Sequence, residues 1–227
     1  TDNLTPILAD TWDAAYWSAQ AALSAARALT EGAPLVYALC RPPGHHAYHD
    51  LYGGYCYLNN AAIAAHWLTR QGHRLAVVDI DYHHGNGTQA IFYDRADVFV
   101  CSLHADPQEE YPYYAGYPEE MGRGAGEGYT LNLPLPLSTR ETDYLHGLAW
   151  ALDAVDGAAP DVPVVSLGFD TLAGDPHGGM GLTPESFRPI GRCLSALGRP
   201  LLLVQEGGYL VDALPAALRA LLEGLTE

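Results

Sequence analysis

The chain has 227 residues, 48% of them hydrophobic, which is enough to bury a sizeable core in one domain or at most two small ones. Its formal charge of −16 argues against a nucleic-acid surface, which needs a basic footprint, and favours cationic ligands, although acidity alone also keeps proteins soluble. No apolar run approaches the ~20 residues of a membrane span, no signal peptide is visible and the four cysteines form no CxxC pattern, so we expect a cytoplasmic protein with reduced thiols and no membrane partner.

In chain order, helical patterns alternate with short apolar runs. Helices are predicted at Thr11–Thr30 and at residues 59–71, 140–155, 184–197 and 211–222. Strands are predicted at residues 35–39, 75–80, 98–103, 162–167 and 201–204. Continuous apolar strands separated by helices are typical of a mostly parallel sheet with helices on both faces. No linker or repeat interrupts the pattern, so residues 1–227 are predicted to form a single α/β domain.

A polar cluster follows the second predicted strand, in the stretch "VVDIDYHHGNGTQAIF" (residues 77–92). In an extended chain alternate side chains share a face, so Asp79, Asp81 and His83 point the same way. Carboxylate oxygen and imidazole nitrogen are both ligands of Zn²⁺, so this set suits a divalent cation. A strand end with solvated charges is the alternative, but two carboxylates two positions apart repel each other without a cation or hydrogen-bond donors nearby.

Three further clusters follow other strands. His45 and His46, in the rigid turn of "CRPPGHHA", are placed for proton transfer at neutral pH, although a histidine pair can also be a surface accident. Asp170, in "VVSLGFDTLAGDP", can complete the metal set, but alone it would be read as a turn residue. Tyr209, in "LLLVQEGGYL", can donate a hydrogen bond to an oxyanion or serve as a core tyrosine. Ligands of open parallel sheets sit beyond the carboxyl ends of the strands, so we expect these clusters to meet.

The combined motifs resemble a known superfamily. The chain contains, in this order, the motifs "RPPGHHA", "GGYCYLNNAA", "VDIDYHHGNGTQ", "SLH", "GFDTLAGDP" and "EGGY". Their order and spacing resemble those of the zinc-dependent histone deacetylases and acetylpolyamine amidohydrolases. The stretch "SLHADPQEEYPYYAGYPEEMGRGAGEG" looks most like the bacterial acetylpolyamine amidohydrolases and the class II-type deacetylases. The resemblance runs through essentially the whole chain and implies an arginase/deacetylase-like fold. Family members usually begin well upstream of this sequence, so an N-terminally shortened form of that fold is expected.

The resemblance also implies roles for individual residues. Zn²⁺ would be held by Asp81, His83 and Asp170, and Fe²⁺ tolerates the same ligand set. His45 and His46 would be the tandem general acid–base histidines, Tyr209 the phenol that polarises the carbonyl, and Asp79 the partner of His45. Some superfamily members carry Asp at position 86; Asn86 would orient His46 without a negative charge that raises its pKa.

Secondary sites follow from the same resemblance. A structural K⁺ or Na⁺ would be bound, largely through backbone carbonyls, by Asp79, Asp81, His83, Ser102 and Leu103. A second monovalent site would use the carbonyls of Phe92, Arg95 and Val98. Tyr55 and Tyr111 match the aromatic walls of the acyl-lysine tunnel, with Gly54 as their backbone neighbour. His177 stands where one polyamine-selective branch carries a gatekeeping Glu.

The expected function is metal-dependent hydrolysis of N-acetyl amides on small cationic amines, most of all acetylpolyamines. Deacetylation of acetyl-lysine in peptides or proteins is an alternative within the same chemistry. A non-catalytic, metal-bound protein that binds acylated amines is the alternative from another class, and a purely structural domain would leave the polar clusters unexplained. An uncovered sheet edge invites pairing, so we predict a homo-oligomer.

Overall fold

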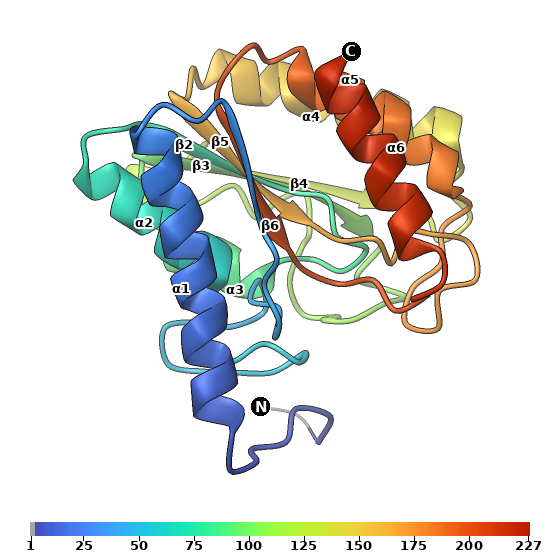
Figure 1. Cartoon of the computed structure of the whole chain (residues 1–227), viewed down its shortest axis with the longest axis horizontal. Coiled ribbons are helices and arrows are strands. Elements are labelled where there is room, and N and C mark those ends of the chain that lie inside the picture. The colour runs from blue at the N-terminus through green and yellow to red at the C-terminus, as the bar shows by residue number, and fades with distance from the viewer. Residues whose placement is uncertain (1–2) are drawn as a thin grey trace.

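The fold is built on one six-stranded parallel sheet, which the computed structural model describes within residues 3–227 (Figure 1). Across the sheet the strands stand in the order β1-β6-β5-β2-β3-β4, and every neighbouring pair is parallel. Their bounds are Leu35–Ala38 (β1), Leu75–Asp79 (β2), Val98–Ala105 (β3), Thr130–Leu135 (β4), Val162–Leu167 (β5) and Leu201–Gln205 (β6).

Helices cover both faces of the sheet, as predicted. Helices α1 (Thr11–Thr30), α2 (Asn60–Arg70) and α3 (Asn86–Phe92) lie on one face. Helices α4 (Glu141–Gly157), α5 (Phe187–Ser195) and α6 (Leu214–Thr226) lie on the other, with short 3₁₀ turns at Gly124–Gly126 and Pro184–Ser186. Each face therefore has its own hydrophobic core.

The strands read as continuous apolar runs because both of their faces are buried. In β2, Leu75 and Val77 point into the core beneath α1 and α2, whereas Ala76 and Val78 point into the core beneath α4, α5 and α6. Both Val77 and Val78 are completely buried. A polar side chain at either position would lose its water on folding, which excludes the polar–apolar alternation of a one-sided sheet.

The sequence analysis did not predict strand β4 or helix α3. Strand β4 reads "TLNLPL", and its burial pattern alternates between buried and half-buried positions because it is an edge strand. Helix α3 has seven residues and opens with Asn-Gly in the middle of the polar cluster, so no helical periodicity can be seen in it. The last helix also begins at Leu214, later than the predicted residue 211. The predicted start at residue 184 is occupied by a 3₁₀ turn, where Thr183 and Ser186 form a capping box.

The order of the strands places a switch point between β2 and β5. From β2 the chain adds β3 and β4 on one side, and then returns to add β5 and β6 on the other. The connections leave the carboxyl ends of β2 and β5 in opposite directions, which opens a crevice between them. Asp79, the last residue of β2, is paired in register with Ser102 of β3 and with Ser166 of β5. The polar cluster at residues 79–86 therefore lies at this crevice.

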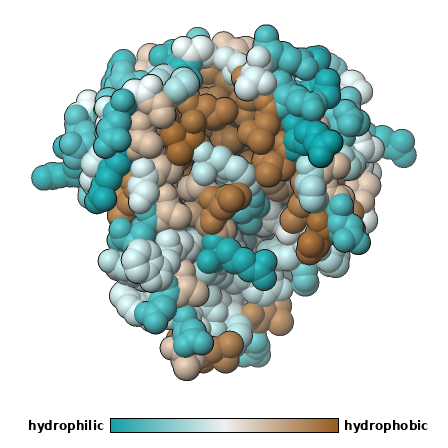
Figure 2. Space-filling view, in the orientation of Figure 1, coloured by the Kyte–Doolittle hydropathy of each residue, from teal (hydrophilic) through white to brown (hydrophobic). Residues whose placement is uncertain are grey.

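The surface shows where the sheet is least covered. Strands β1 and β4 are its edges, and on the face shown in Figure 2 apolar side chains gather in the space between β1 and α6. Tyr37, Leu214 and Leu218 are only partly buried there. The predicted homo-oligomer depends on such an edge and stays a prediction. Within residues 3–227, no helix has the length and apolarity needed to span a membrane.

Helices α5 and α6 pack closely together, and each helix has a glycine at the contact. A Cβ on Gly191 of α5 would run into the backbone of Leu221 and lie 2.9 Å from the amide nitrogen of Leu225, both in α6. We expect Gly191→Ala to push the helices apart and lower the free energy of unfolding by roughly 1–3 kcal/mol, or about 3–10 °C in melting temperature. Gly157→Ala is the matched control, because Gly157 ends α4 with nothing within 4 Å of the added carbon. A Gly191→Ala protein as stable as the Gly157→Ala protein would show that this contact does not fix the helix spacing.

Candidate active site

A cavity of about 460 Å³ opens at the carboxyl ends of the central strands. Its floor holds Asp81 and His83 after β2, His45 and His46 after β1, and Gly207 after β6. Its walls are mostly aromatic and include Tyr55, Tyr111, Tyr113, His177 and Tyr209. Residues from the loops that follow β1, β2, β3, β5 and β6 thus meet in one concave site of the size that small ligands occupy.

Asp81, His83 and Asp170 converge at the floor of this cavity. Their ligand atoms all lie within 4.8 Å of one another. The Nδ1 atom of His83 is 3.1 Å from Oδ2 of Asp170 and 3.3 Å from Oδ1 of Asp81. Both carboxylates have no exposed surface at all. The structure therefore brings together the three residues predicted as metal ligands.

The other oxygens of the two carboxylates are held by the backbone. Oδ2 of Asp81 accepts a hydrogen bond of 2.7 Å from the amide of Gly207, and Oδ1 of Asp170 accepts one of 2.9 Å from the amide of Tyr82. A Cβ on Gly207 or on Gly168 would run into the Asp81 carboxylate, so both glycines are required for the close approach. The carboxylates are fixed before any ligand arrives.

The charge of this set fits a divalent cation. Burial, and next the negative charge of Asp81, raises the pKa of Asp170 to about 7. Burial opposes ionisation of Asp81 too, but positive charge on His45 and hydrogen bonds from His83 hold its pKa below the usual range. Two buried carboxylates beside one imidazole give the donor set of a catalytic Zn²⁺ site, with positions left open toward the cavity. The residues present therefore fit the predicted metal.

The two tandem histidines have different partners. Nδ1 of His45 lies 3.0 Å from Oδ2 of Asp79, whereas Nδ1 of His46 lies 2.6 Å from Oδ1 of Asn86. Burial disfavours charge on His45, yet the carboxylates of Asp81 and Asp79 raise its pKa well above the ordinary value. Burial, and next the positive charge on His45 and on His83, lowers the pKa of His46 well below the ordinary value. At neutral pH, His45 is thus cationic and His46 neutral.

Tyr209 is held at the cavity wall by its backbone. The amides of Tyr209 and Leu210 donate hydrogen bonds of 2.7 and 2.9 Å to Oδ2 of Asp175, which is buried. Burial, and next the charges of Asp81 and Asp170, raises the pKa of the Tyr209 phenol far above its ordinary value. The phenol therefore stays protonated and is available as a donor. Asp175 was not singled out in the sequence, although it lies in the "GFDTLAGDP" motif that contains Asp170.

The mouth of the cavity brings together the predicted substrate-binding residues. The ring of His177 is 4.7 Å from that of Tyr209 and 5.8 Å from that of Tyr55, measured between centroids. On the opposite side, the ring of Tyr111 stands edge-on to His46 at 4.8 Å. Gly54 has a positive φ of 56°, and a Cβ there would run into the His46 ring. Tyr55, Tyr111, Gly54 and His177 thus frame a narrow entrance above the histidines.

Comparison with known proteins identifies the family of this chain. The histone deacetylase domain family matches residues 1–225. The chain belongs to the histone deacetylase family. It is 48% identical over 223 residues to an acetylpolyamine amidohydrolase of Burkholderia pseudomallei, covering 98% of this chain and 65% of that protein. It is 38% identical over 233 residues to histone deacetylase 8 of Arabidopsis thaliana, covering 95% of this chain and 60% of that protein. The chain thus spans less than two thirds of the length of these relatives.

A solved structure confirms the predicted arginase/deacetylase-like fold. The crystal structure of an acetylpolyamine aminohydrolase from Burkholderia pseudomallei superposes with a TM-score of 0.96 at 49% sequence identity. The match covers 99% of this chain and 66% of that one. The predicted resemblance to the deacetylase superfamily is therefore confirmed at the level of sequence and of backbone.

The two monovalent-ion sites stay predictions. Asp79 and Ser102 are neighbours across β2 and β3, as the first site requires, and Ser102 Oγ lies 2.8 Å from Nδ1 of His104. In the second set, the carbonyl of Phe92 already accepts a hydrogen bond of 2.9 Å from the amide of Arg95. That carbonyl has a second lone pair, so the contact neither requires an ion nor blocks one.

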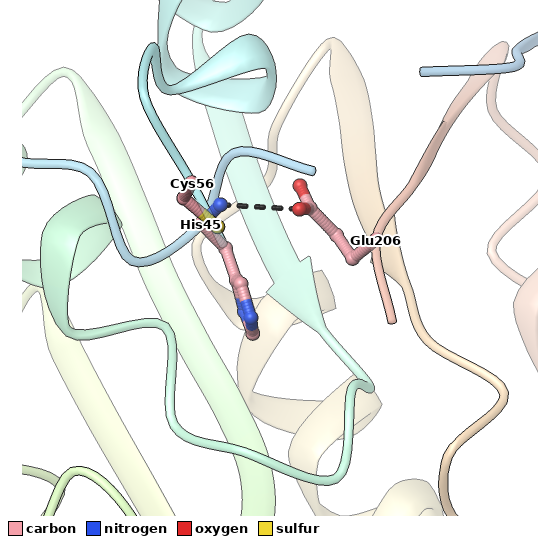
Figure 3. A group of neighbouring side chains, drawn as sticks. All are labelled: His45, Cys56 and Glu206. Atoms are coloured by element: carbon pink, nitrogen blue, oxygen red, sulfur yellow. Dashed lines mark hydrogen bonds between the residues drawn. The ribbon is translucent and has the colours of Figure 1, made fainter. Parts of the chain in front are cut away.

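A buried carboxylate outside the predicted set supports the histidine turn. Oε2 of Glu206 accepts hydrogen bonds of 2.6 and 3.1 Å from the successive amides of Gly44 and His45, and burial raises the pKa of Glu206 to about 7. Cys56 lies beside them, but Figure 3 shows the His45 ring pointing away from the Glu206 carboxylate. Because Oε2 already takes two amide protons and Nδ1 of His45 bonds Asp79, we assign this group to holding the turn and not to a metal.

The fit to a metal can be tested without turnover. Zinc at about 100 times its dissociation constant should raise the melting temperature of the wild-type protein by roughly 5–10 °C. Asp170→Asn should abolish this shift, because the ligand charge is lost. The metal-free variant should be no less stable than wild type, because the repulsion between Asp170 and Asp81 is removed while the bond from Tyr82 persists. Asp143→Asn, on the exposed side of α4, is the control and should keep the wild-type shift. An undiminished shift in Asp170→Asn would place the metal elsewhere.

Proposed function

We propose that this chain hydrolyses the amide bond of N-acetylated cationic amines, with acetylpolyamines as the leading substrate class. The observation that carries the proposal is the meeting of His45, His46 and Tyr209 around the Asp81/His83/Asp170 set, with Asp79 beside the first histidine and Asn86 beside the second. A protein that only binds acylated amines has no need of both a proton acceptor and a proton donor at the same place.

His46 is the proposed general base. It is neutral, and its Nδ1 donates to the amide oxygen of Asn86, so the lone pair of Nε2 is free to accept the proton of the attacking water. The same ring, now charged, then gives the proton to the leaving nitrogen as the carbon–nitrogen bond breaks. The products are acetate and the free amine. His45 keeps its positive charge beside Asp79 and acts electrostatically.

Tyr209 is the proposed oxyanion donor. Its phenol stays protonated, and its backbone is fixed by Asp175, so the donor is oriented before the substrate carbonyl becomes negative. A Zn²⁺ ion held by Asp81, His83 and Asp170 would act as a Lewis acid on that carbonyl and would lower the pKa of the attacking water. Both effects act where the negative charge develops.

The charge of the cavity supports a cationic substrate. Of the residues that line it within the described part of the chain, none is Lys or Arg, and Glu110 lies at its mouth beside Tyr111. The whole chain carries a charge of −16, which raises the local concentration of cations. The names of the two relatives compared above give different substrates, because one is an acetylpolyamine amidohydrolase and the other a histone deacetylase. Acetyl-lysine peptides are therefore the second candidate substrate, with the same chemistry.

Acetate release tests the function and ranks the substrates. The zinc-loaded protein should release acetate from acetylputrescine and acetylspermidine faster than from an acetyl-lysine peptide of zero net charge, because the cavity is acidic. The ratio should shrink as salt is added, since screening weakens exposed charges. No release from any of the three substrates, with zinc occupancy verified, would favour the acyl-amine binding protein instead.

Removal of one hydroxyl tests the role of Tyr209. Tyr209→Phe should lower kcat by about 10²–10³, the usual effect of losing one oxyanion donor, while KM changes little. Tyr129→Phe, which removes a hydroxyl far from the cavity lining, should leave both constants unchanged. A Tyr209→Phe enzyme within about threefold of wild type would overturn the assignment.

A further inference from the structure

We propose that Tyr48 and Tyr114 are positioning residues that fix the proton of His46 on Nδ1, by holding the Asn86 carboxamide in one of its two orientations. The inference deepens the proposed function and rests on it, because it concerns the base that takes the proton of water. Neither tyrosine belongs to the cavity lining. They reach Asn86 from behind, from two loops that are far apart in the sequence.

The geometry joins four side chains in a row. Nδ2 of Asn86 donates hydrogen bonds of 3.2 Å to the hydroxyl of Tyr48 and 2.9 Å to that of Tyr114. On its other side, Oδ1 of Asn86 faces Nδ1 of His46 at 2.6 Å. Asn86 is only 2% exposed, so water cannot replace these hydrogen-bond partners of its amide.

In the observed orientation both N–H groups of the Asn86 amide find an acceptor. They go to the phenol oxygens of Tyr48 and Tyr114. The amide oxygen is left facing His46. Since an oxygen can only accept, the nitrogen of His46 that faces it must carry the proton.

The opposite orientation of the Asn86 carboxamide leaves a hydrogen-bond donor without a partner. A rotated amide would present Nδ2 to His46, where Nδ1 can accept one N–H only. Within residues 3–227, Oδ1 of Asn86 has no polar partner on that side other than His46. The second N–H of a rotated amide would therefore be buried without an acceptor. The phenol oxygens would also lose the two N–H groups that they now accept, and each phenol would have to donate its own proton to the amide oxygen instead. Buried unsatisfied donors are costly, so the two phenols select the orientation in which His46 has Nδ1–H.

The position of the proton decides whether Nε2 of His46 can act as the base. A neutral imidazole has one protonated and one bare nitrogen, and the hydrogen bond at one nitrogen decides the state of the other. The tautomer matters because His46 can take a proton only with a neutral ring, and only at its bare nitrogen. With the proton on Nδ1, the lone pair of Nε2 faces the cavity. The other tautomer would present an N–H to the water and could not act as a base.

The test reads the tautomer directly. The zinc-loaded protein is labelled with ¹⁵N-histidine, and the His46 signals are assigned through a His46→Gln variant. Wild type should show a protonated Nδ1 and a bare Nε2. In Tyr48→Phe/Tyr114→Phe, the Nδ1 and Nε2 shifts should move toward each other as the second tautomer becomes populated. On acetylputrescine, kcat should fall roughly tenfold with KM changed less than about twofold.

Two further variants separate positioning from loop stability. Tyr117→Phe removes the 2.7 Å bond from the Tyr117 hydroxyl to the Tyr113 carbonyl, which holds the same loop without touching Asn86. It should keep the wild-type tautomer and kcat. Adding Asn86→Asp to the double variant should restore Nδ1–H, because a carboxylate presents an accepting oxygen whichever way it turns.

The outcomes are distinct. A double variant with the wild-type ¹⁵N pattern overturns the proposal, even if its activity falls. A double variant that is not rescued by Asn86→Asp overturns it too, because the tautomer would then depend on loop packing. Absence of turnover in the wild-type protein would count against the proposed function alone, since the ¹⁵N pattern needs no substrate.

Discussion

Two carboxylates without exposed surface, Asp81 and Asp170, face one imidazole at the centre of this molecule, and the rest of the site depends on their charge. Burying two like charges side by side is costly unless donors and a cation compensate them. The backbone supplies part of that compensation through the amides of Gly207 and Tyr82. His45 and His83 supply positive charge beside them, since the pKa of each is raised by these carboxylates, and a bound cation would supply more. Burial, and next the same two negative charges, raises the pKa of Tyr209 and keeps its phenol protonated, so the proposed metal ligands and the proposed oxyanion donor are electrostatically linked.

The tandem histidines differ in charge because their hydrogen-bond partners differ. His45 and His46 share one turn, and their ring centroids are 4.0 Å apart. Asp79 supplies a full negative charge to the first ring, while Asn86 supplies only an amide oxygen to the second. A positive His45 then disfavours a second positive charge on His46, so the charge of one ring supports the neutrality of the other. His45 needs the nearby carboxylates to stay charged because burial opposes its charge, whereas burial already favours a neutral His46.

The parts visible in the sequence are those set by local pattern. Strands β2 and β5 are apolar on both faces, and Asp81 and Asp170 follow them within a few residues, so a shared site at the strand ends could be predicted from the order of the chain alone. The supporting contacts could not, because they join distant segments. Glu206 holds the amide of Gly44 across 162 positions, and a lone Glu before two glycines gives no sign of it. Strand β4 was missed for a related reason: an edge strand with one half-buried side lacks the continuous apolar run that marks the others.

The floor and the mouth of the cavity are held by different kinds of contact, and this difference has a consequence for specificity. Floor residues such as Asp81 and Asp170 are bonded to backbone amides, whose positions follow from the register of a parallel sheet buried on both faces. Mouth residues such as Tyr55 and His177 contact each other through ring edges and lie in loops outside the six strands. A substitution at the floor disturbs charges that are coupled to one another, whereas a substitution at the mouth changes shape or charge at one point. We therefore expect substrate choice to vary at the mouth while the proposed hydrolytic chemistry stays the same, because the two depend on separate sets of contacts.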